Sequence, residues 1–467
     1  MTKSVLRQIT PDAKERAQVD RLAAFLIDRI CAAAQRGFED VEVRLDGSVA
    51  KDTWLSGEAD IDIFLRVPPD KPRSFLESEC LQVARRALKG YRVIERFAEH
   101  PYVESSVNGL RVNIVPCYRV EKGQWLSATD RTPYHTEYMK LHLSDALRNE
   151  VRLLKKILKV AELYGAEVKV KGFSGFLCEV LTLFYGSFFN VLEASSNWQA
   201  HHVIDVEAWY KDRKGDIPTL FNDPLVVVDP VDKVRNVASA VSPQSLWEFV
   251  SLSREFLGKP HRRFFTPPGD SCRLAATRRR MARTQSDLLI LHIGKVDAVI
   301  DVIWSQLYKT ERVLKDLLRK QGFNVLRSKA WSDEVGDCAL IFELEDLQMK
   351  DLLLHAGPPV SMKTSSERFL TKHVDAPDTL AGPWVEGNRW MTKKKRKYTD
   401  AVQLLKDALS GGGSKIGVPH RISTRLGRRY RILVNDQALD LCRSSSSFHT
   451  ALVRLLEGRP VWLAGKD

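Results

Sequence analysis

Two aspartates stand two positions apart inside one apolar run, Ala59–Val67 (ADIDIFLRV), which Pro68 and Pro69 close. The alternation of apolar and polar residues predicts a β-strand. Residues at positions i and i+2 of a strand project from the same face, so Asp60 and Asp62 are expected to present neighbouring carboxylates. Their like charges repel, and a divalent cation between them relieves that repulsion. Taken alone, the pair also fits the solvated outer face of an edge strand.

The surrounding segments predict a mixed α/β domain. Thr10 and Pro11 resemble a helix start, and helical spacing of apolar residues continues to about Ala34. A strand is expected at VEVRL, a short helix after it, and a helix near Phe75–Leu88. The stretches RVIERFA and LRVNIVPCY predict two further strands. We assign residues 1–136 to this head domain.

The remainder of the chain is expected to form two more regions. Residues 137–258 are mainly helical in pattern, with long helices at NEVRLLKKILKVAELYG, GFSGFLCEVLTLFYGSFFNVL and SPQSLWEFVSLSREFL. Residues 259–467 begin with a basic, loop-like stretch, HRRFFTPPGDSCRLAATRRRMAR. A strand, a long helix and another strand follow, and this order predicts a small sheet domain. The segment SGGGSKIG is expected to be a flexible joint.

Composition narrows the classes of function that this chain can have. Lys and Arg total 72 against 59 Asp and Glu, and this net charge of +13 favours a polyanionic partner. Seven cysteines without CxxC pairs argue against a disulfide framework or zinc site and fit a reducing, cytoplasmic compartment. No apolar run approaches ~20 residues, so we expect neither membrane insertion nor secretion.

A phosphate site is expected next to the carboxylate pair. Gly47 and Ser48 lie twelve to thirteen residues before Asp60, where the preceding strand ends and a helix begins. Glycine lets a phosphate approach the backbone, and the Ser48 hydroxyl with nearby amides can hold its oxygens. Lys51 adds a cation one turn later. A phosphate cradle beside a carboxylate pair is the minimal arrangement for nucleotidyl transfer.

The segment GSVAKDTWLSGEADIDIFLRVP closely resembles the signature of the DNA-polymerase-β-like nucleotidyltransferase superfamily. More narrowly, the chain resembles the archaeal-type (class I) CCA-adding enzymes, the tRNA nucleotidyltransferases. Further similar segments occur in the same order as in that family: NIVPCY, ATDRTPYHTEYM, NEVRLLKKILKVAELYGAEVKVKGFSGFLCEVLTLFYGSF, DPVDKVRNVA, GPPV and GPWVEGNRW. The resemblance covers essentially the whole chain and is strongest through residues 40–260.

The resemblance implies a multidomain α/β + α protein. It would have a polymerase-β-like catalytic head, a helical neck that contacts the nucleotide and the tRNA end, and a C-terminal α+β body and tail. The implied reaction is untemplated transfer of CMP, CMP and AMP from CTP and ATP to the 3′-hydroxyl of tRNA, with release of pyrophosphate and two Mg²⁺ ions. The body and tail would hold the acceptor arm and the TΨC side of tRNA. A homodimer is compatible with this reading.

The family motifs imply a role for ten residues. The implied catalytic and metal-binding residues are Asp60, Asp62 and Asn113. The implied nucleotide-binding residues are Gly47, Ser48, Lys51, His135, Lys155, Tyr164 and Arg235. Without the resemblance, Lys155 could lie on a solvated helix face, His135 could be a capping or loop residue, and Tyr164 could belong to a helix-end core.

Two positions depart from the family pattern. Lys51 stands where arginine is usual, which keeps the charge and loses the bidentate fork. Asn113 stands where the third catalytic carboxylate is expected. Its carbonyl oxygen can coordinate a metal but supplies no negative charge, for which Asp46 could compensate.

Asn113 keeps alternatives open. The chain could be a tRNA-binding protein with weakened turnover, or it could add only some of the nucleotides. A related RNA nucleotidyltransferase of the poly(A) type is another alternative.

Basic residues gather in four patches of the second half, interleaved with aromatic residues. The patches are Arg262-Arg263, Arg278–Arg280 with Arg283, Lys393–Lys397, and Arg425 with Arg428, Arg429 and Arg431. The interleaved aromatics are Phe264, Phe265, Trp384, Trp390, Tyr398 and Tyr430. Such patches are often only solvated surface, but behind a polymerase-like head they favour RNA binding through phosphate contacts.

Overall fold

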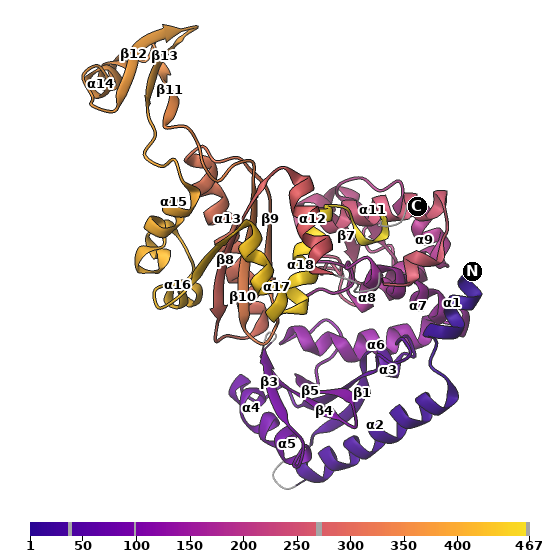
Figure 1. Cartoon of the computed structure of the whole chain (residues 1–467). Coiled ribbons are helices and arrows are strands. Elements are labelled where there is room, and N and C mark those ends of the chain that lie inside the picture. Colours follow the sequence, from indigo (N-terminus) through magenta and orange to yellow (C-terminus); the bar gives the residue numbers. More distant parts are fainter. Residues whose placement is uncertain (36–39, 98–99, 268–272, 464–467) are drawn as a thin grey trace. The chain divides into compact units, whose positions relative to one another are not determined.

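The computed structural model describes residues 1–35, 40–97, 100–267 and 273–463 (Figure 1). The chain forms two compact units. One comprises Met1–Gly269 together with Pro460–Asp467, and the other comprises Asp270–Arg459. The second unit is therefore inserted between two segments of the first.

The head contains a five-stranded sheet in the order β1-β2-β5-β4-β3. The strands are β1 (Glu42–Asp46), β2 (Asp60–Val67), β5 (Leu110–Tyr118), β4 (Pro101–Val107) and β3 (Val93–Phe97). Strands β2 and β5 run parallel, and the other neighbours run antiparallel. The four expected strands are present, while β4 was not expected. β4 completes the sheet between β5 and β3.

Three helices accompany this sheet. Helices α2 (Ala13–Ala34) and α5 (Glu79–Ala87) share a core with the strands, and α4 (Arg73–Glu77) precedes α5. The expected start of α2 was wrong by a few residues, because Asp12 caps the helix through the backbone N–H of Glu15 at 2.7 Å. Thr10 instead ends an additional helix, α1 (Thr2–Ile9).

The rest of the first unit is mainly helical, as expected. Its helices are α6 (Arg131–His142), α7 (Asp145–Val160), α8 (Gly175–Tyr185), α9 (Phe188–Ser195), α10 (Ile217–Leu220) and α11 (Pro243–Gly258). A parallel strand pair, β6 (His202–Asp205) with β7 (Leu225–Val228), was not expected. Val5 and Ile9 of α1 and Trp462 near the other end of the chain are buried in the same core as α7, α8 and α11.

No single helix in the described ranges is long and apolar enough to cross a membrane. Helices α8 and α9 pass that test as a pair by length and composition, but they are bent by 92°.

The second unit contains two sheets. A four-stranded sheet has the order β14-β8-β10-β9, and a three-stranded sheet has the order β11-β13-β12. The strands are β8 (Asp287–Lys295), β9 (Val325–Ser332), β10 (Asp337–Leu344), β11 (Leu352–Pro359), β12 (Thr379–Glu386), β13 (Arg389–Lys395) and β14 (Arg431–Val434). The helices are α12 (Leu274–Thr284), α13 (Ile300–Lys320), α14 (Lys363–His373), α15 (Ala401–Ala408), α16 (His420–Leu426), α17 (Ala438–Ser444) and α18 (Ser446–Glu457). The strand, long helix and strand expected near the start of this unit correspond to β8, α13 and β10, with β9 between α13 and β10 in the chain.

Two local expectations for this unit were wrong. The basic stretch expected to be a loop contains helix α12, which packs against α17 and α18, while its residues 268–272 lie outside the described residues. The glycine segment forms an ordered turn over Ser410–Ile416, with Gly412 and Gly413 buried at positive φ. A Cβ on Gly412 would lie 2.3 Å from the carbonyl oxygen of Ser423, so close packing accounts for this glycine.

Candidate active site

The two central strands of the head sheet bring the expected carboxylates together. Asp62 pairs in register with Asp46 of β1 on one side and with Asn113 of β5 on the other. Asp60, two residues earlier on β2, pairs with Arg111 of β5. Because residues that pair in register share a face of the sheet, all five side chains lie on one surface. The side chains that were expected to bind metal therefore lie in one row, and Arg111 is an addition to it.

Asn113 is bound to Asp62 and keeps one oxygen unused. Its amide nitrogen donates to Asp62 Oδ1 at 2.8 Å, while its own Oδ1 is buried and has no hydrogen-bond partner among the residues that the structure describes. Burial raises the pKa of Asp62 to about 6, although the Asn113 hydrogen bond opposes that shift. A half-buried carboxylate beside a buried, unpartnered amide oxygen fits a divalent cation. Within the described ranges, no three His, Cys, Asp or Glu side chains cluster as a metal site, since the third position is an amide.

Asp60 forms an ion pair with Arg111, a residue that the sequence motif does not include. Arg111 donates to Asp60 Oδ1 from Nε at 2.8 Å and also contacts Oδ2 through Nη2. This bidentate pair is about half exposed on the arginine side. Asp46, the residue expected to compensate for Asn113, is fully buried and ion-paired with Arg44 at 3.0 Å. Its charge is thus already engaged within the head.

The glycine before this row is required by close contact. Gly47 has a φ of +75°, and a Cβ there would lie 2.2 Å from Asp62 Oδ2. The strand end can therefore approach the carboxylate only without a side chain. Ser48 follows at the start of α3 (Gly47–Ala50), partly exposed, with no side-chain hydrogen bond to another described residue.

Lys51 and Lys155 share one buried carboxylate. Glu179 of α8 accepts from Lys51 Nζ at 2.5 Å through Oε2, and from Lys155 Nζ at 3.2 Å through Oε1. Thr53 also donates to Glu179 Oε1 at 2.5 Å, and both its carbonyl and its hydroxyl accept from Lys155. The two ammonium groups lower the pKa of Glu179 to about 2 despite its complete burial. Lys155 is itself buried, so the alternative of a solvated helix face is wrong.

Tyr164 reaches the same cluster from the loop after α7. A Cβ on Gly175 would lie 2.8 Å from the Tyr164 hydroxyl and 3.6 Å from Lys155 Nζ. The tyrosine ring also packs under Lys159, whose ammonium lies 4.9 Å from the ring centroid. Gly175, the first residue of α8, has no side chain, so it leaves room for the Tyr164 hydroxyl and Lys155 Nζ.

His135 is a buried residue of α6 and belongs to a second ion-paired group. Its Nε2 lies 2.8 Å from Asp229 Oδ2, and the same oxygen accepts from Arg235 Nη1 at 2.6 Å. Burial lowers the pKa of His135, whereas the hydrogen bond to Asp229 raises it. His135 is not a capping or loop residue. Arg235 keeps about a third of its side chain exposed.

Phe176 connects the two groups. Its ring lies 3.9 Å from the His135 ring between centroids, and Lys51 Nζ lies 5.5 Å from the Phe176 centroid. The structure thus unites the predicted residues into one continuous site on the head and the adjoining helices.

Sequence reasoning missed several of the partners that hold this site. The missed residues are Thr53, Arg111, Phe176, Glu179 and Asp229. Two carried a usable signal, since Glu179 is a lone acid within the apolar α8 and Asp229 directly follows the apolar β7.

The fold and this site define the class of protein. In this mixed α/β head, Gly47 and Ser48 follow strand β1, and the aspartate pair lies on the neighbouring strand β2. This arrangement is the head of a polymerase-β-like nucleotidyltransferase. Three family models match the chain accordingly: a nucleotidyltransferase domain at residues 27–135, a tRNA nucleotidyltransferase second domain at 149–266, and a CCA-adding enzyme C-terminal domain at 285–435. The chain belongs to the CCA-adding enzyme family.

Curated relatives match over nearly the full length. The CCA-adding enzyme of Methanothermobacter thermautotrophicus is 39% identical over 87% of each chain. That of Methanoregula boonei is 34% identical over 97% of this chain and 96% of its own. Among solved structures, a cytoplasmic RNA terminal U-transferase covers 57% of this chain and 97% of its own, with 14% identity and a TM-score of 0.45.

Proposed function

We propose that this protein completes the 3′ end of tRNA by adding CMP, CMP and AMP from CTP and ATP without a nucleic-acid template. The observation that carries the proposal is the row Asp62–Asn113, with its unpartnered amide oxygen, beside Gly47 and Ser48. Near-full-length similarity to enzymes named for CCA addition supports the choice of reaction.

Asp60, Asp62 and Asn113 would hold two Mg²⁺ ions, and when bound these ions activate the RNA 3′-hydroxyl and neutralise the triphosphate. Asn113 contributes an oxygen without charge, so the protein's own contribution is one negative charge smaller than with three carboxylates. Before metal binds, Arg111 holds the Asp60 carboxylate in the row. The 3′ oxygen bonds to the α-phosphorus of the nucleotide, and the bond from that phosphorus to the pyrophosphate oxygen breaks.

The cationic residues beside this row would bind the nucleotide. Ser48 and Lys51 contact the triphosphate oxygens, and Lys155 supplies a second positive charge behind Lys51. One glutamate faces these two ammonium groups, so a net positive charge remains for the phosphates.

His135 and Tyr164 add triphosphate and sugar contacts. Arg235 faces the base or the tRNA end.

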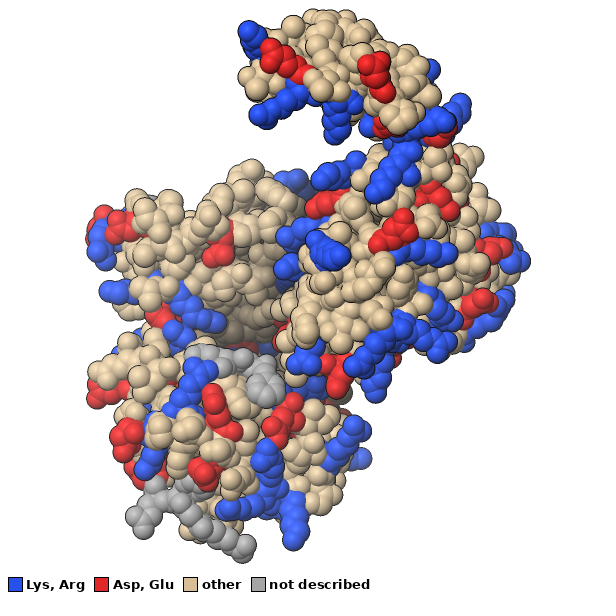
Figure 2. All heavy atoms as spheres, turned by 90° about the vertical axis from the view of Figure 1, so that its left-hand side faces the viewer, with Lys and Arg blue, Asp and Glu red and all other residues tan. Residues whose placement is uncertain are grey.

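The basic second unit would hold the acceptor arm and TΨC side of the tRNA. Figure 2 shows lysine and arginine side chains spread across the face that it draws. The proposed division is a head over residues 1–136, a neck over 137–258 and an RNA-binding body and tail over 259–467. A cytoplasmic location follows from the substrate.

Label incorporation tests the proposal. A tRNA lacking its last three nucleotides is incubated with Mg²⁺, CTP and ATP, and wild type should extend it by three residues. Asp60→Ala and Asp62→Ala should abolish extension, whereas Asp70→Ala, an exposed loop variant, should not.

Other products would refute CCA addition. Long adenylate tails would indicate a poly(A)-type enzyme. Tight tRNA binding without extension would indicate a binding protein, and arrest after one or two additions would indicate a partial activity.

A further inference from the structure

The second unit has a basic hollow whose lining includes none of the residues that the family motifs assign. It has a volume of about 250 Å³ and lies where β8, β14 and the segment after α16 meet. The residues that line it are His292, Ile293, Gly294, Arg425, Arg429, Tyr430 and Arg431.

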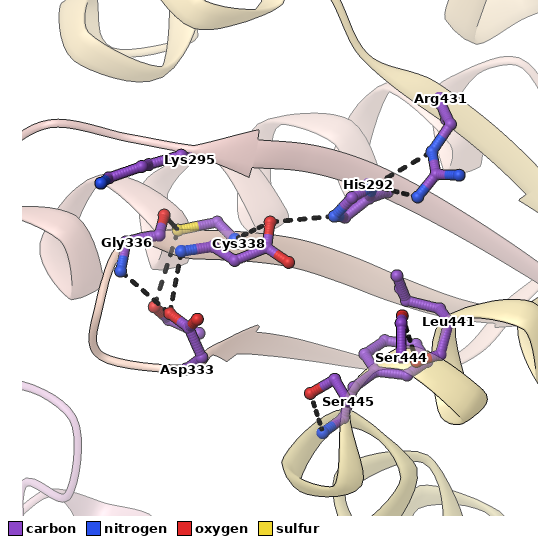
Figure 3. Close-up of polar contacts among 12 residues, drawn as sticks. His292, Lys295, Asp333, Gly336, Cys338, Arg431, Leu441, Ser444 and Ser445 are labelled. Carbon is purple, nitrogen blue, oxygen red and sulfur yellow. Dashed lines mark hydrogen bonds and ion pairs between the residues drawn. The ribbon is translucent and has the colours of Figure 1, made fainter.

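Arg431 is held in place by an imidazole. Its Nε and Nη2 lie 3.3 and 3.0 Å from His292 Nδ1, and His292 Nε2 lies 2.9 Å from Asp337 Oδ1 (Figure 3). A guanidinium can only donate, so Nδ1 accepts and the ring proton sits on Nε2, where it is donated to Asp337. The chain Asp337–His292–Arg431 thus fixes one edge of the guanidinium, and Nη1 makes no hydrogen bond to another described residue.

Arg425 is also held in place, in its case by two backbone carbonyls. Its Nε donates to the carbonyl of Lys295 at 3.1 Å, and Nη1 donates to the carbonyl of Arg429 at 2.5 Å. Nη2 lies over Gly294, where a Cβ would approach it to 2.5 Å. Gly294 has a φ of +79°, so the sequence provides space for this guanidinium.

Arg429 and Tyr430 complete the lining. The Arg429 side chain is exposed and makes no hydrogen bond or ion pair with another described residue, and the Tyr430 ring is partly exposed. Three arginines therefore line the hollow, while the Asp337 carboxylate is bound to His292 and not to Arg431. Arg425 and Arg431 are held in place and Arg429 is exposed, and guanidinium N–H groups of this kind suit phosphate oxygens, while an adjacent aromatic ring suits a base or ribose.

We propose that this hollow binds one nucleotide of the RNA substrate, with its phosphate on Arg425, Arg429 and Arg431 and its base or ribose against Tyr430. This inference rests on the proposed function for the identity of the RNA. Its lining residues are not those proposed to carry out transfer, so the proposal concerns the affinity for RNA and not the transfer step. A free nucleotide shares the same chemistry, and the test separates the two sources.

The test measures the Kd of a tRNA transcript lacking its terminal CCA, in EDTA and without nucleotide, so that no addition occurs. Arg429→Ala and Arg431→Ala should each raise Kd about 5–10-fold and lower the salt slope by about 1. Tyr430→Ala should weaken binding several-fold with an unchanged slope, and Tyr430→Phe should bind like wild type because the ring is kept. The matched control is Arg443→Ala, which removes an exposed arginine of the same unit that pairs with Asp440.

The proposal is overturned if Arg429→Ala, Arg431→Ala and Tyr430→Ala all bind the transcript as tightly as Arg443→Ala does. It is also overturned if CTP binding weakens in these variants while tRNA binding does not, since the hollow would then take a free nucleotide. Circular dichroism verifies that each variant is folded. Failure of CCA addition by wild type would refute the proposed function, but the binding comparison between the variants could still be interpreted.

Discussion

The side-chain amide of Asn113 donates to Asp62 Oδ1 across the parallel strands β2 and β5 at 2.8 Å. A carboxylate at position 113 would face Asp62 with a like charge and would need a cation to remain there. The amide instead stabilises the row through a hydrogen bond, so Asp62 and Asn113 can stay side by side without a cation between them.

Asn113→Asp should therefore make the head more dependent on metal. We expect Mn²⁺ to bind about tenfold more tightly, because one more charged ligand faces the ion. In EDTA the variant should be less stable by about 1–2 kcal/mol, because the hydrogen bond is replaced by repulsion. Mn²⁺ titration by electron paramagnetic resonance and urea unfolding with and without Mg²⁺ measure the two effects. Equal Mn²⁺ affinity in both proteins would contradict the interpretation.

Asp62→Asn should lose activity and gain stability at neutral pH. Burial raises the pKa of Asp62 to about 6, above its ordinary 3.8, so the ionised carboxylate costs stability at pH values above about 6. That cost disappears as the pH falls below about 4, where the carboxyl is protonated in both states. We expect the variant to be more stable by about 1–2 kcal/mol at pH 7.5 in EDTA and equal to wild type near pH 4. Urea unfolding at both values, with Asp70→Asn as the exposed control, decides the outcome.

Gly47→Ala should abolish transfer and destabilise the head. The added methyl group would meet Asp62 Oδ2 at 2.2 Å, and the positive φ adds backbone strain. Gly57→Ala is the matched control, because Gly57 has a φ of +77° with nothing within 4 Å of its Cβ position. Both variants should lose about 1 kcal/mol from strain, while only Gly47→Ala should also lose CTP incorporation and Mn²⁺ binding. Similar activity of the two variants would exclude a steric role for Gly47.

Glu179→Gln should weaken nucleotide binding. The substitution leaves Lys51 and Lys155 without their shared buried carboxylate, so both ammonium groups lose position and Lys155 loses charge compensation. We expect KM for CTP to rise about tenfold, with a smaller change in kcat, and the unfolding midpoint to fall by several degrees. The control is Glu58→Gln, whose partner Lys159 is on the same helix as Lys155 but partly exposed. An unchanged KM in Glu179→Gln would refute the positioning role.

The carboxylate row was predictable because its geometry is local. The period of two along a strand places Asp60 and Asp62 on one face, and a single strand pairing then adds Asn113. Strands β6 and β7 were missed because four-residue segments carry little periodicity of their own. Strand β4 was missed because a polar residue, Ser105, occupies one of its buried positions and hides the alternation.

The charged cluster was not predictable from local pattern. Lys51 and Glu179 are separated by 128 positions and meet only because α8 packs beside the head. The burial of Lys155 likewise depends on that packing, and helical periodicity alone allowed a solvated lysine. Pairings between distant segments are decided by the tertiary fold, which spacing along the chain does not contain.

Trp462 lies in the core that α1, α7, α8 and α11 build. In the sequence, however, it follows the inserted second unit, whereas those four helices precede it. During synthesis, the whole of the second unit, Asp270–Arg459, must be translated before this tryptophan is added. The core of the first unit therefore receives Trp462 only after its other segment and the inserted unit have been made, so folding of the first unit cannot be completed earlier.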